Sequence, residues 1–109
     1  MDFVINSNLN EQNNCWDVDV TGEIDIFNSA EFKTTLLKLL DEKPLDLSID
    51  CKKLTYIDST GLGALVAVLK KTKEFEKNVI LKNVKPNSAK LFKITSLDKV
   101  FKIEGELNE

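Results

Sequence analysis

Apolar and polar residues alternate strictly in two segments of the chain. Residues 15–21 place Trp16, Val18 and Val20 on one face, and residues 45–51 repeat the pattern. Alternation with a period of two predicts a strand with one buried face. Short apolar runs bounded by turn residues predict three more strands, at residues 2–7, 79–84 and 100–103.

Apolar residues recur every three or four positions in three other segments, which predicts helices. The first helix is predicted to begin at Asn28, which fits a capping box with Glu31, and to end before Pro44. A longer helix is predicted over residues 59–75, with lysines on its solvent side. A shorter helix is predicted to end near Ile94.

Polar segments separate these elements. Residues 6–14, with five asparagines, predict an exposed hairpin loop, Gly22 to Asp25 predicts a break after the second strand, and residues 104–109 predict an acidic tail. Strands come first and then alternate with helices, which predicts an α/β fold with right-handed parallel crossovers. The N-terminal pair is expected to form a hairpin, so the sheet is mixed. The length predicts one domain, residues 1–109.

The charged residues exclude several classes of function. All fifteen basic residues are lysines, and the chain has neither arginine nor histidine. A hydrolase with a histidine base and a metal site built on imidazole ligands are therefore excluded. A net charge of −3 and a pI of about 5 argue against nucleic-acid binding, which needs a clustered basic face.

The sequence also bears on the compartment of the protein. No segment approaches the roughly 18 apolar residues that cross a bilayer, and the first ten residues lack the pattern of a signal peptide. We expect a cytoplasmic protein without membrane insertion. Cys15 and Cys51 are then interpreted as small buried thiols rather than a redox pair. The alternating carboxylates of Asp17, Asp19 and Glu23 predict a solvated strand face rather than a cation site.

Residues 56–64 have features that the start of a helix does not require. Asp58, Ser59 and Thr60 can each cap the following helix, although one cap is enough. Two glycines follow within the first turn, where each costs about 1 kcal/mol relative to alanine. Missing side chains leave a smooth platform for another surface, and the positive end of the helix dipole tolerates a phosphate on a nearby hydroxyl.

Three other interpretations of this segment stay open on physical grounds. It is an ordinary capped helix if the glycines only relieve crowding against the sheet. A phosphate-binding loop is disfavoured because the Gly-x-x-x-x-Gly-Lys-Ser/Thr spacing is missing. A serine nucleophile is disfavoured because the Gly-x-Ser-x-Gly elbow and a histidine base are both missing.

Two strings resemble the landmarks of a known family. Asp58 to Gly63 (DSTGLG) resembles the signature of STAS domains, which are named for sulfate transporters and anti-sigma-factor antagonists. Gly22 to Asp25 (GEID) resembles the second landmark of the family, and the resemblance covers essentially the whole chain in length, landmark spacing and element order. It implies an α/β fold with a mixed four- to five-stranded sheet and helices packed mainly on one face.

The resemblance also implies roles for individual residues. Ser59 corresponds to the residue that an anti-sigma factor with serine kinase activity phosphorylates, and a separate serine phosphatase would remove the phosphate. The residues implied to contact the partner or to shape that contact are Asp25, Asp58, Thr60, Gly61, Leu62 and Gly63.

The implied function is that of an anti-sigma-factor antagonist. The unmodified protein would bind the anti-sigma kinase and release the sigma factor, and phosphorylation of Ser59 would end that binding. Such a protein is not an enzyme and needs neither cofactor nor metal. One alternative keeps the fold and makes the chain a STAS accessory subunit of a lipid or anion transport complex. Another is a nucleotide-binding domain, for which the missing arginine and P-loop lysine predict weak binding at most.

Overall fold

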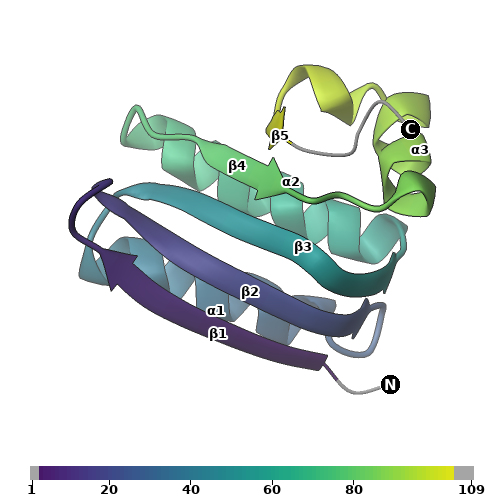
Figure 1. Ribbon diagram of the computed structural model, residues 1–109, viewed down its shortest axis with the longest axis horizontal. Helices are drawn as coiled ribbons and strands as arrows, with labels where there is room; N and C mark the ends of the chain where they lie inside the picture. Colours follow the sequence, from purple (N-terminus) through teal and green to yellow (C-terminus); the bar gives the residue numbers. More distant parts are fainter. Residues whose placement is uncertain (1–2, 105–109) are drawn as a thin grey trace.

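A five-stranded sheet organises the chain, and the computed structural model describes residues 3–104 of it. The strands are β1 (Phe3–Asn10), β2 (Cys15–Ile24), β3 (Asp46–Ile57), β4 (Val79–Lys82) and β5 (Lys102–Glu104). They lie across the sheet in the order β1-β2-β3-β4-β5 (Figure 1). The pair β1 and β2 is antiparallel, and each later pair of neighbours is parallel. The predicted mixed sheet with an N-terminal hairpin is confirmed.

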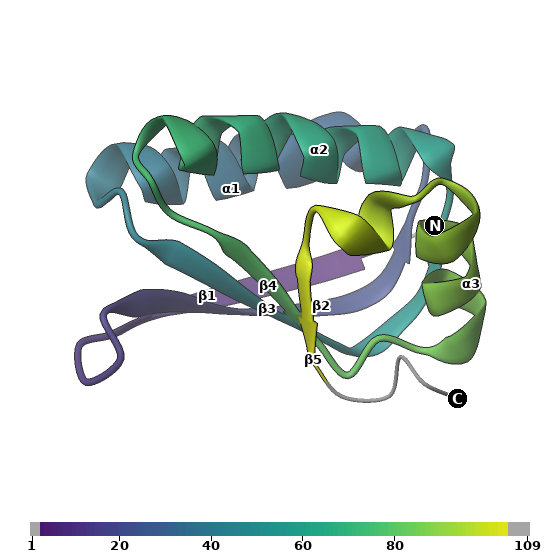
Figure 2. The same ribbon diagram turned by 90° about the horizontal axis from the view of Figure 1, so that it is seen from above.

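Helices connect the parallel strands. They are α1 (Ser29–Glu42), α2 (Ser59–Glu74), α3 (Pro86–Ile94) and the short 3-10 helix η1 (Leu97–Lys99). Helices α1 and α2 lie side by side on one face of the sheet, whereas α3 lies at one end of it (Figure 2). The prediction of helices mainly on one face is therefore confirmed.

The core lies between the sheet and the two long helices because their apolar faces meet there. Val18 of β2, Leu36 of α1 and Val68 of α2 are completely buried. Trp16 lies at the margin of this core, where its indole Nε1 donates a hydrogen bond to the carbonyl oxygen of Lys43 at 3.0 Å. A polar atom on a buried aromatic side chain thus has the partner that its burial requires.

The first strand is longer than the sequence predicted. The loop expected over residues 6–14 is confined to residues 11–14, because β1 pairs with β2 as far as Asn10, which lies opposite Cys15. The side-chain amide of Asn10 donates to the carboxylate of Asp17 at 3.0 Å, so an asparagine that favours turns is held here in a strand.

The break predicted at Gly22 to Asp25 comes later than expected, because β2 continues to Ile24 and only Asp25 lies outside it. The register of β2 with β3 shifts on both sides of Gly22, as at a β-bulge. Gly22 has a φ of 106°, which an L side chain rarely adopts. The glycine therefore bends the strand toward its end without terminating it.

The capping box predicted for the first helix is also wrong. Asn28 is the residue before α1, but its side chain makes no capping hydrogen bond to the helix. Its amide oxygen accepts from the backbone N–H of Asp25 at 2.9 Å, and its amide nitrogen donates to the carbonyl oxygen of Glu23 at 2.9 Å. The side chain fixes the turn between β2 and α1 instead of the helix end.

The C-terminal elements differ from the prediction by a few residues. The strand expected at residues 100–103 lies at Lys102–Glu104, because η1 occupies the chain just before it. The predicted strand at residues 79–84 ends at Lys82. The acidic tail is described only at Glu104, and its remaining residues lie outside the described part of the chain.

Candidate functional site

The N-terminus of α2 is built on the side chain of Asp58. This residue has extended backbone angles, and its Oδ1 atom accepts hydrogen bonds from the backbone N–H groups of Thr60 at 3.0 Å and Gly61 at 3.1 Å. Of the three candidate caps, Asp58 is therefore the one that caps the helix. Ser59 and Thr60 occupy its first turn.

The side chain of Thr60 supports this cap. Its hydroxyl donates to the same Oδ1 atom of Asp58 at 2.6 Å. This hydrogen bond is the main reason that the pKa of Asp58 lies below its ordinary value, with the two backbone donors adding to the effect. Asp58 is thus a fixed negative charge beside Ser59 at neutral pH.

Ser59 is exposed, unlike the residues on either side of it, which are half-buried. Its hydroxyl is free of hydrogen bonds to other described residues, since the cap is already supplied by Asp58. A hydroxyl in this position is accessible to an enzyme that approaches the end of the helix. The helix cap therefore does not depend on the Ser59 hydroxyl.

The two glycines of α2 have different structural roles. A Cβ atom on Gly61 would lie 2.6 Å from Cγ1 of Ile57 and 2.8 Å from Cγ2 of Ile24, so this glycine permits the helix to approach the strand ends closely. A Cβ atom on Gly63 would meet nothing within 4 Å. Relief of crowding thus explains Gly61 and leaves Gly63, which is exposed, unexplained by packing.

Leu62 and Asp25, two of the predicted contact residues, differ in burial. Leu62 is 3% exposed and belongs to the core, so direct contact of its side chain with a partner stays a prediction. Asp25 is half-buried and follows Ile24, whose carbonyl oxygen accepts from the backbone N–H of Asp58 at 3.2 Å. This bond brings the ends of β2 and β3 together, and with them the two predicted acidic residues.

Two apolar side chains beside Asp25 did not form part of the predicted site. Ile26 is 67% exposed and Phe27 is 88% exposed, in the turn that the carboxylate of Asp25 stabilises by accepting from the backbone N–H of Phe27 at 2.9 Å. The sequence signal that could have revealed them is the position of two large apolar residues outside the periodic pattern of any predicted strand or helix.

Ser59 also lines a pocket of about 460 Å³. Tyr56 and Asp58 line it near the end of β3, and Leu91 and Ile94 line it from α3. Sequence reasoning missed this pocket because α3 begins far from Ser59 along the chain. Only the fold brings the two segments together.

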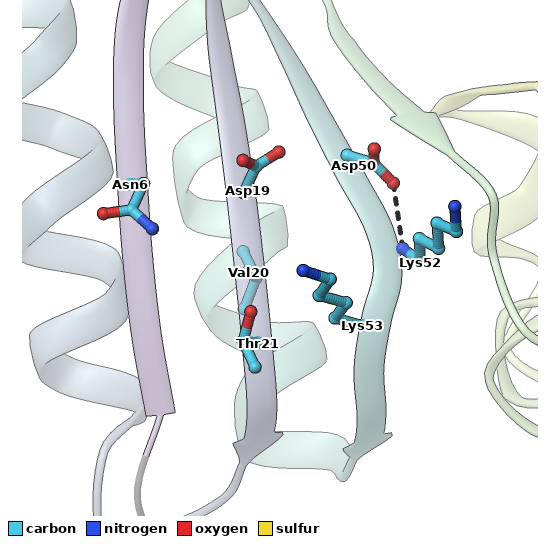
Figure 3. A pocket seen from close by; sticks show the side chains of 7 residues that line it. All are labelled: Asn6, Asp19, Val20, Thr21, Asp50, Lys52 and Lys53. Atoms are coloured by element: carbon cyan, nitrogen blue, oxygen red, sulfur yellow. Dashed lines mark hydrogen bonds between the residues drawn. The ribbon is translucent and has the colours of Figure 1, made fainter.

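The uncovered face of the sheet carries a separate polar pocket (Figure 3). Asp19 and Thr21 line it from β2, and Asp50 and Lys53 line it from β3. The carboxylate of Asp50 accepts from the backbone N–H of Lys52 at 2.9 Å. Residues 3–104 contain no group of three side chains that could hold a metal ion, and the carboxylates of this face lie among lysines.

Both cysteines are free and buried, as the sequence predicted. Cys15 of β2 pairs with Asp46 of β3, and Cys51 lies five residues further along β3. The two thiols are therefore not neighbours. Burial raises the pKa of Cys51 to about 12, which keeps its thiol protonated and unreactive.

No helix of the described chain is both long and apolar enough to cross a membrane.

Comparison with known proteins identifies the family. The model of the STAS domain matches residues 6–109. The anti-sigma-B factor antagonist of Bacillus subtilis (strain 168) is 32% identical over 102 residues, which are 94% of this chain and 93% of that protein. An anti-sigma factor antagonist from Mycobacterium paratuberculosis is similar in structure, with a TM-score of 0.74 and 25% identity over 96% of this chain and 89% of that one.

The Bacillus cell fate determinant SpoIIAA in its phosphorylated form has the same fold, with a TM-score of 0.71 and 15% identity over 96% of this chain and 95% of that one. The fold, the placement of the two landmark strings at one end of the sheet and the match over nearly the full length agree. The chain belongs to the STAS domain family.

Proposed function

We propose that this protein is an anti-sigma-factor antagonist whose binding is switched off by phosphorylation of Ser59. The observation that carries the proposal is the exposed hydroxyl of Ser59 at a helix end whose cap is supplied by another residue. The name of the Bacillus subtilis relative, which matches along nearly the whole chain, supports the same function. The protein acts in the cytoplasm as one STAS domain over residues 1–109.

The unphosphorylated protein binds an anti-sigma factor that has serine kinase activity, and this binding releases the sigma factor. The contact surface is the end of the sheet that carries Asp25, Asp58 and Ser59. Gly63 supports this assignment, because the space around it is open and a partner backbone can approach closely. Thr60, Gly61 and Leu62 act mainly by holding Asp58 and the helix start in place.

Phosphorylation of Ser59 adds roughly −1.5 to −2 charges next to the carboxylate of Asp58. The helix tolerates the phosphate because its N-terminal end carries a partial positive charge. A closely fitting partner surface does not tolerate it, since the added group is bulky and strongly hydrated. A hundredfold loss of affinity needs only about 2.7 kcal/mol. A serine phosphatase restores binding, and the antagonist itself catalyses no reaction.

The transport-complex alternative is less well supported. The relative that this chain matches over 93% of its length is named for sigma-factor regulation rather than for transport. Gene neighbourhood gives an independent discrimination between the two. A gene for an anti-sigma kinase and a gene for a sigma factor beside this one favour the antagonist.

The direct test is phosphorylation by the candidate anti-sigma kinase from the same genome. The wild type, Ser59→Ala and Ser7→Ala are incubated with the kinase and ATP, and intact mass is measured. We expect one added phosphate on the wild type and on Ser7→Ala, and none on Ser59→Ala. Ser7→Ala is the matched control, because it removes the hydroxyl of another exposed serine, on β1 and outside the proposed contact surface. Equal phosphorylation of all three proteins would contradict the proposal.

A further inference from the structure

The two edge strands of the sheet differ in how they are protected from pairing with another chain. Short length, charged side chains, prolines and bulges are the features that prevent such pairing. β5 is an edge of three residues, of which Lys102 and Glu104 are charged and exposed. β1 is an edge of eight residues, Phe3–Asn10, without charge or proline and without a bulge in its register with β2. The edge formed by β5 is therefore protected, whereas the edge formed by β1 is not.

The outer side of β1 is open to a further strand. Backbone N–H and C=O groups of alternate residues point away from β2, as in any antiparallel pair. Figure 1 shows no described strand beyond β1, and Figure 2 shows α1 and α2 on the face of the sheet rather than at its edge. A strand added at this edge would therefore give hydrogen-bond partners to backbone groups that β2 does not reach.

The side chains of β1 are complementary to those of a second, antiparallel β1. With a two-fold axis through Ser7, Ile5 lies opposite Leu9 of the second copy, and both side chains are half-buried against the core, so pairing covers apolar surface that is still exposed. Asn6 then lies opposite Asn8, and both are exposed, with side-chain amides that can bond each other across the strands. An axis through Asn6 would instead place Ile5 opposite Ser7. The axis through Ser7 therefore gives the better match of apolar with apolar and polar with polar side chains.

We propose that β1 pairs with β1 of a second copy of this chain, antiparallel and with Ser7 on the two-fold axis. The contact uses the same surface of both copies and joins the two five-stranded sheets into one. It is separate from the surface proposed to bind the anti-sigma factor, because antiparallel pairing places the two Ser59 hydroxyls at opposite ends of the joined sheet. A contact along one strand is smaller than the roughly 1,200 Å² typical of stable complexes, so the dimer is weak and forms as the concentration rises.

The test places charges on the two-fold axis. Analytical ultracentrifugation follows the association of the wild type, Ser7→Lys, Ser7→Glu and an equimolar mixture of the two variants, from about 1 μM to 1 mM. Ser7 is exposed, so the folded monomer accommodates either charge. Each variant alone places like charges directly opposite each other, and we expect its dimerisation to be weaker than that of the wild type by at least about fivefold. In the mixture an ammonium group meets a carboxylate, and we expect dimerisation to return to within about twofold of the wild type.

Thr95→Lys is the matched control, because it adds the same charge at an exposed residue at the end of α3 and leaves β1 unchanged. It should associate like the wild type, and urea unfolding of each variant checks that the monomer keeps its stability. A wild type that stays monomeric over the whole range would overturn the inference and leave the proposed function standing, since that function needs no self-association. Unchanged dimerisation in both Ser7 variants would assign the dimer to another surface. Weakened dimerisation without recovery in the mixture would also refute the pairing, because position 7 would then not lie opposite itself.

Discussion

At the scale of single residues, the two glycines of α2 separate packing from function. Gly61→Ala brings a methyl group within 3 Å of Ile57 and Ile24, so we expect the free energy of unfolding to fall by about 1–3 kcal/mol. Gly63→Ala meets open space, and we expect it to rise by about 0.5–1 kcal/mol because alanine favours the helix. Urea unfolding of the two variants measures both changes. Opposite signs are required, and a neutral Gly61→Ala would contradict the crowding.

The pair formed by Asp58 and Thr60 predicts a dependence on pH. The pKa of Asp58 is lowered in the folded protein, so its capping bonds stabilise the fold above the unfolded value of about 3.9. This stabilisation is lost as the pH falls through the lower folded value. We expect Thr60→Val to raise the pKa of Asp58, as followed by NMR, and to cost about 0.5–1.5 kcal/mol at pH 7. The cost should shrink at pH 2.

Thr35→Val is the matched control for this variant. The hydroxyl of Thr35 donates to the carbonyl oxygen of Glu31 at 2.9 Å, an acceptor that does not titrate. Its cost should therefore be the same at pH 7 and pH 2. A loss for Thr60→Val that is equally independent of pH would show that its hydroxyl does not act through the carboxylate.

At the scale of elements, the success of prediction follows from what each pattern encodes. Long periodic segments such as residues 59–75 are predicted well, because the spacing of their apolar residues shows which helix face is buried. The bounds of the hairpin loop and the end of β2 were predicted less accurately. Pairing with a neighbouring strand overrides the local turn preference at Asn10 and Gly22. Asn28 has the residue type of a cap, but its side chain bonds the backbone of Asp25 and Glu23 within the turn that precedes the helix.

The same distinction applies to the candidate site. The string from Asp58 to Gly63 is contiguous, so its chemistry was visible before the fold was known. Phe27 and Ile94 were missed because their significance depends on distance in space from Ser59. A site assembled at the ends of parallel strands draws on loops that are separate in the sequence, and only part of it is contiguous.

At the scale of the whole molecule, the proposed switch at Ser59 requires that the fold remain intact after phosphorylation. Phosphorylation would shift the net charge from −3 by roughly −1.5 to −2, yet the charge is placed at the exposed start of α2 rather than in the core. The helix dipole favours an anion there by about 0.3–1 kcal/mol, and the nearby carboxylate of Asp58 opposes it. These opposing effects should leave the free energy of unfolding changed by less than about 1 kcal/mol.

Urea unfolding of the phosphorylated and unphosphorylated proteins tests this expectation when it is paired with titration of each form against the anti-sigma factor. We expect nearly equal midpoints and at least a hundredfold difference in affinity, because phosphorylation acts on the contact surface and not on the core. Matching losses of stability and affinity would instead mean that the modification acts by unfolding the end of α2. The switch would then be a change of local order rather than a block to docking, and the cap formed by Asp58 would be the part of the molecule that fails.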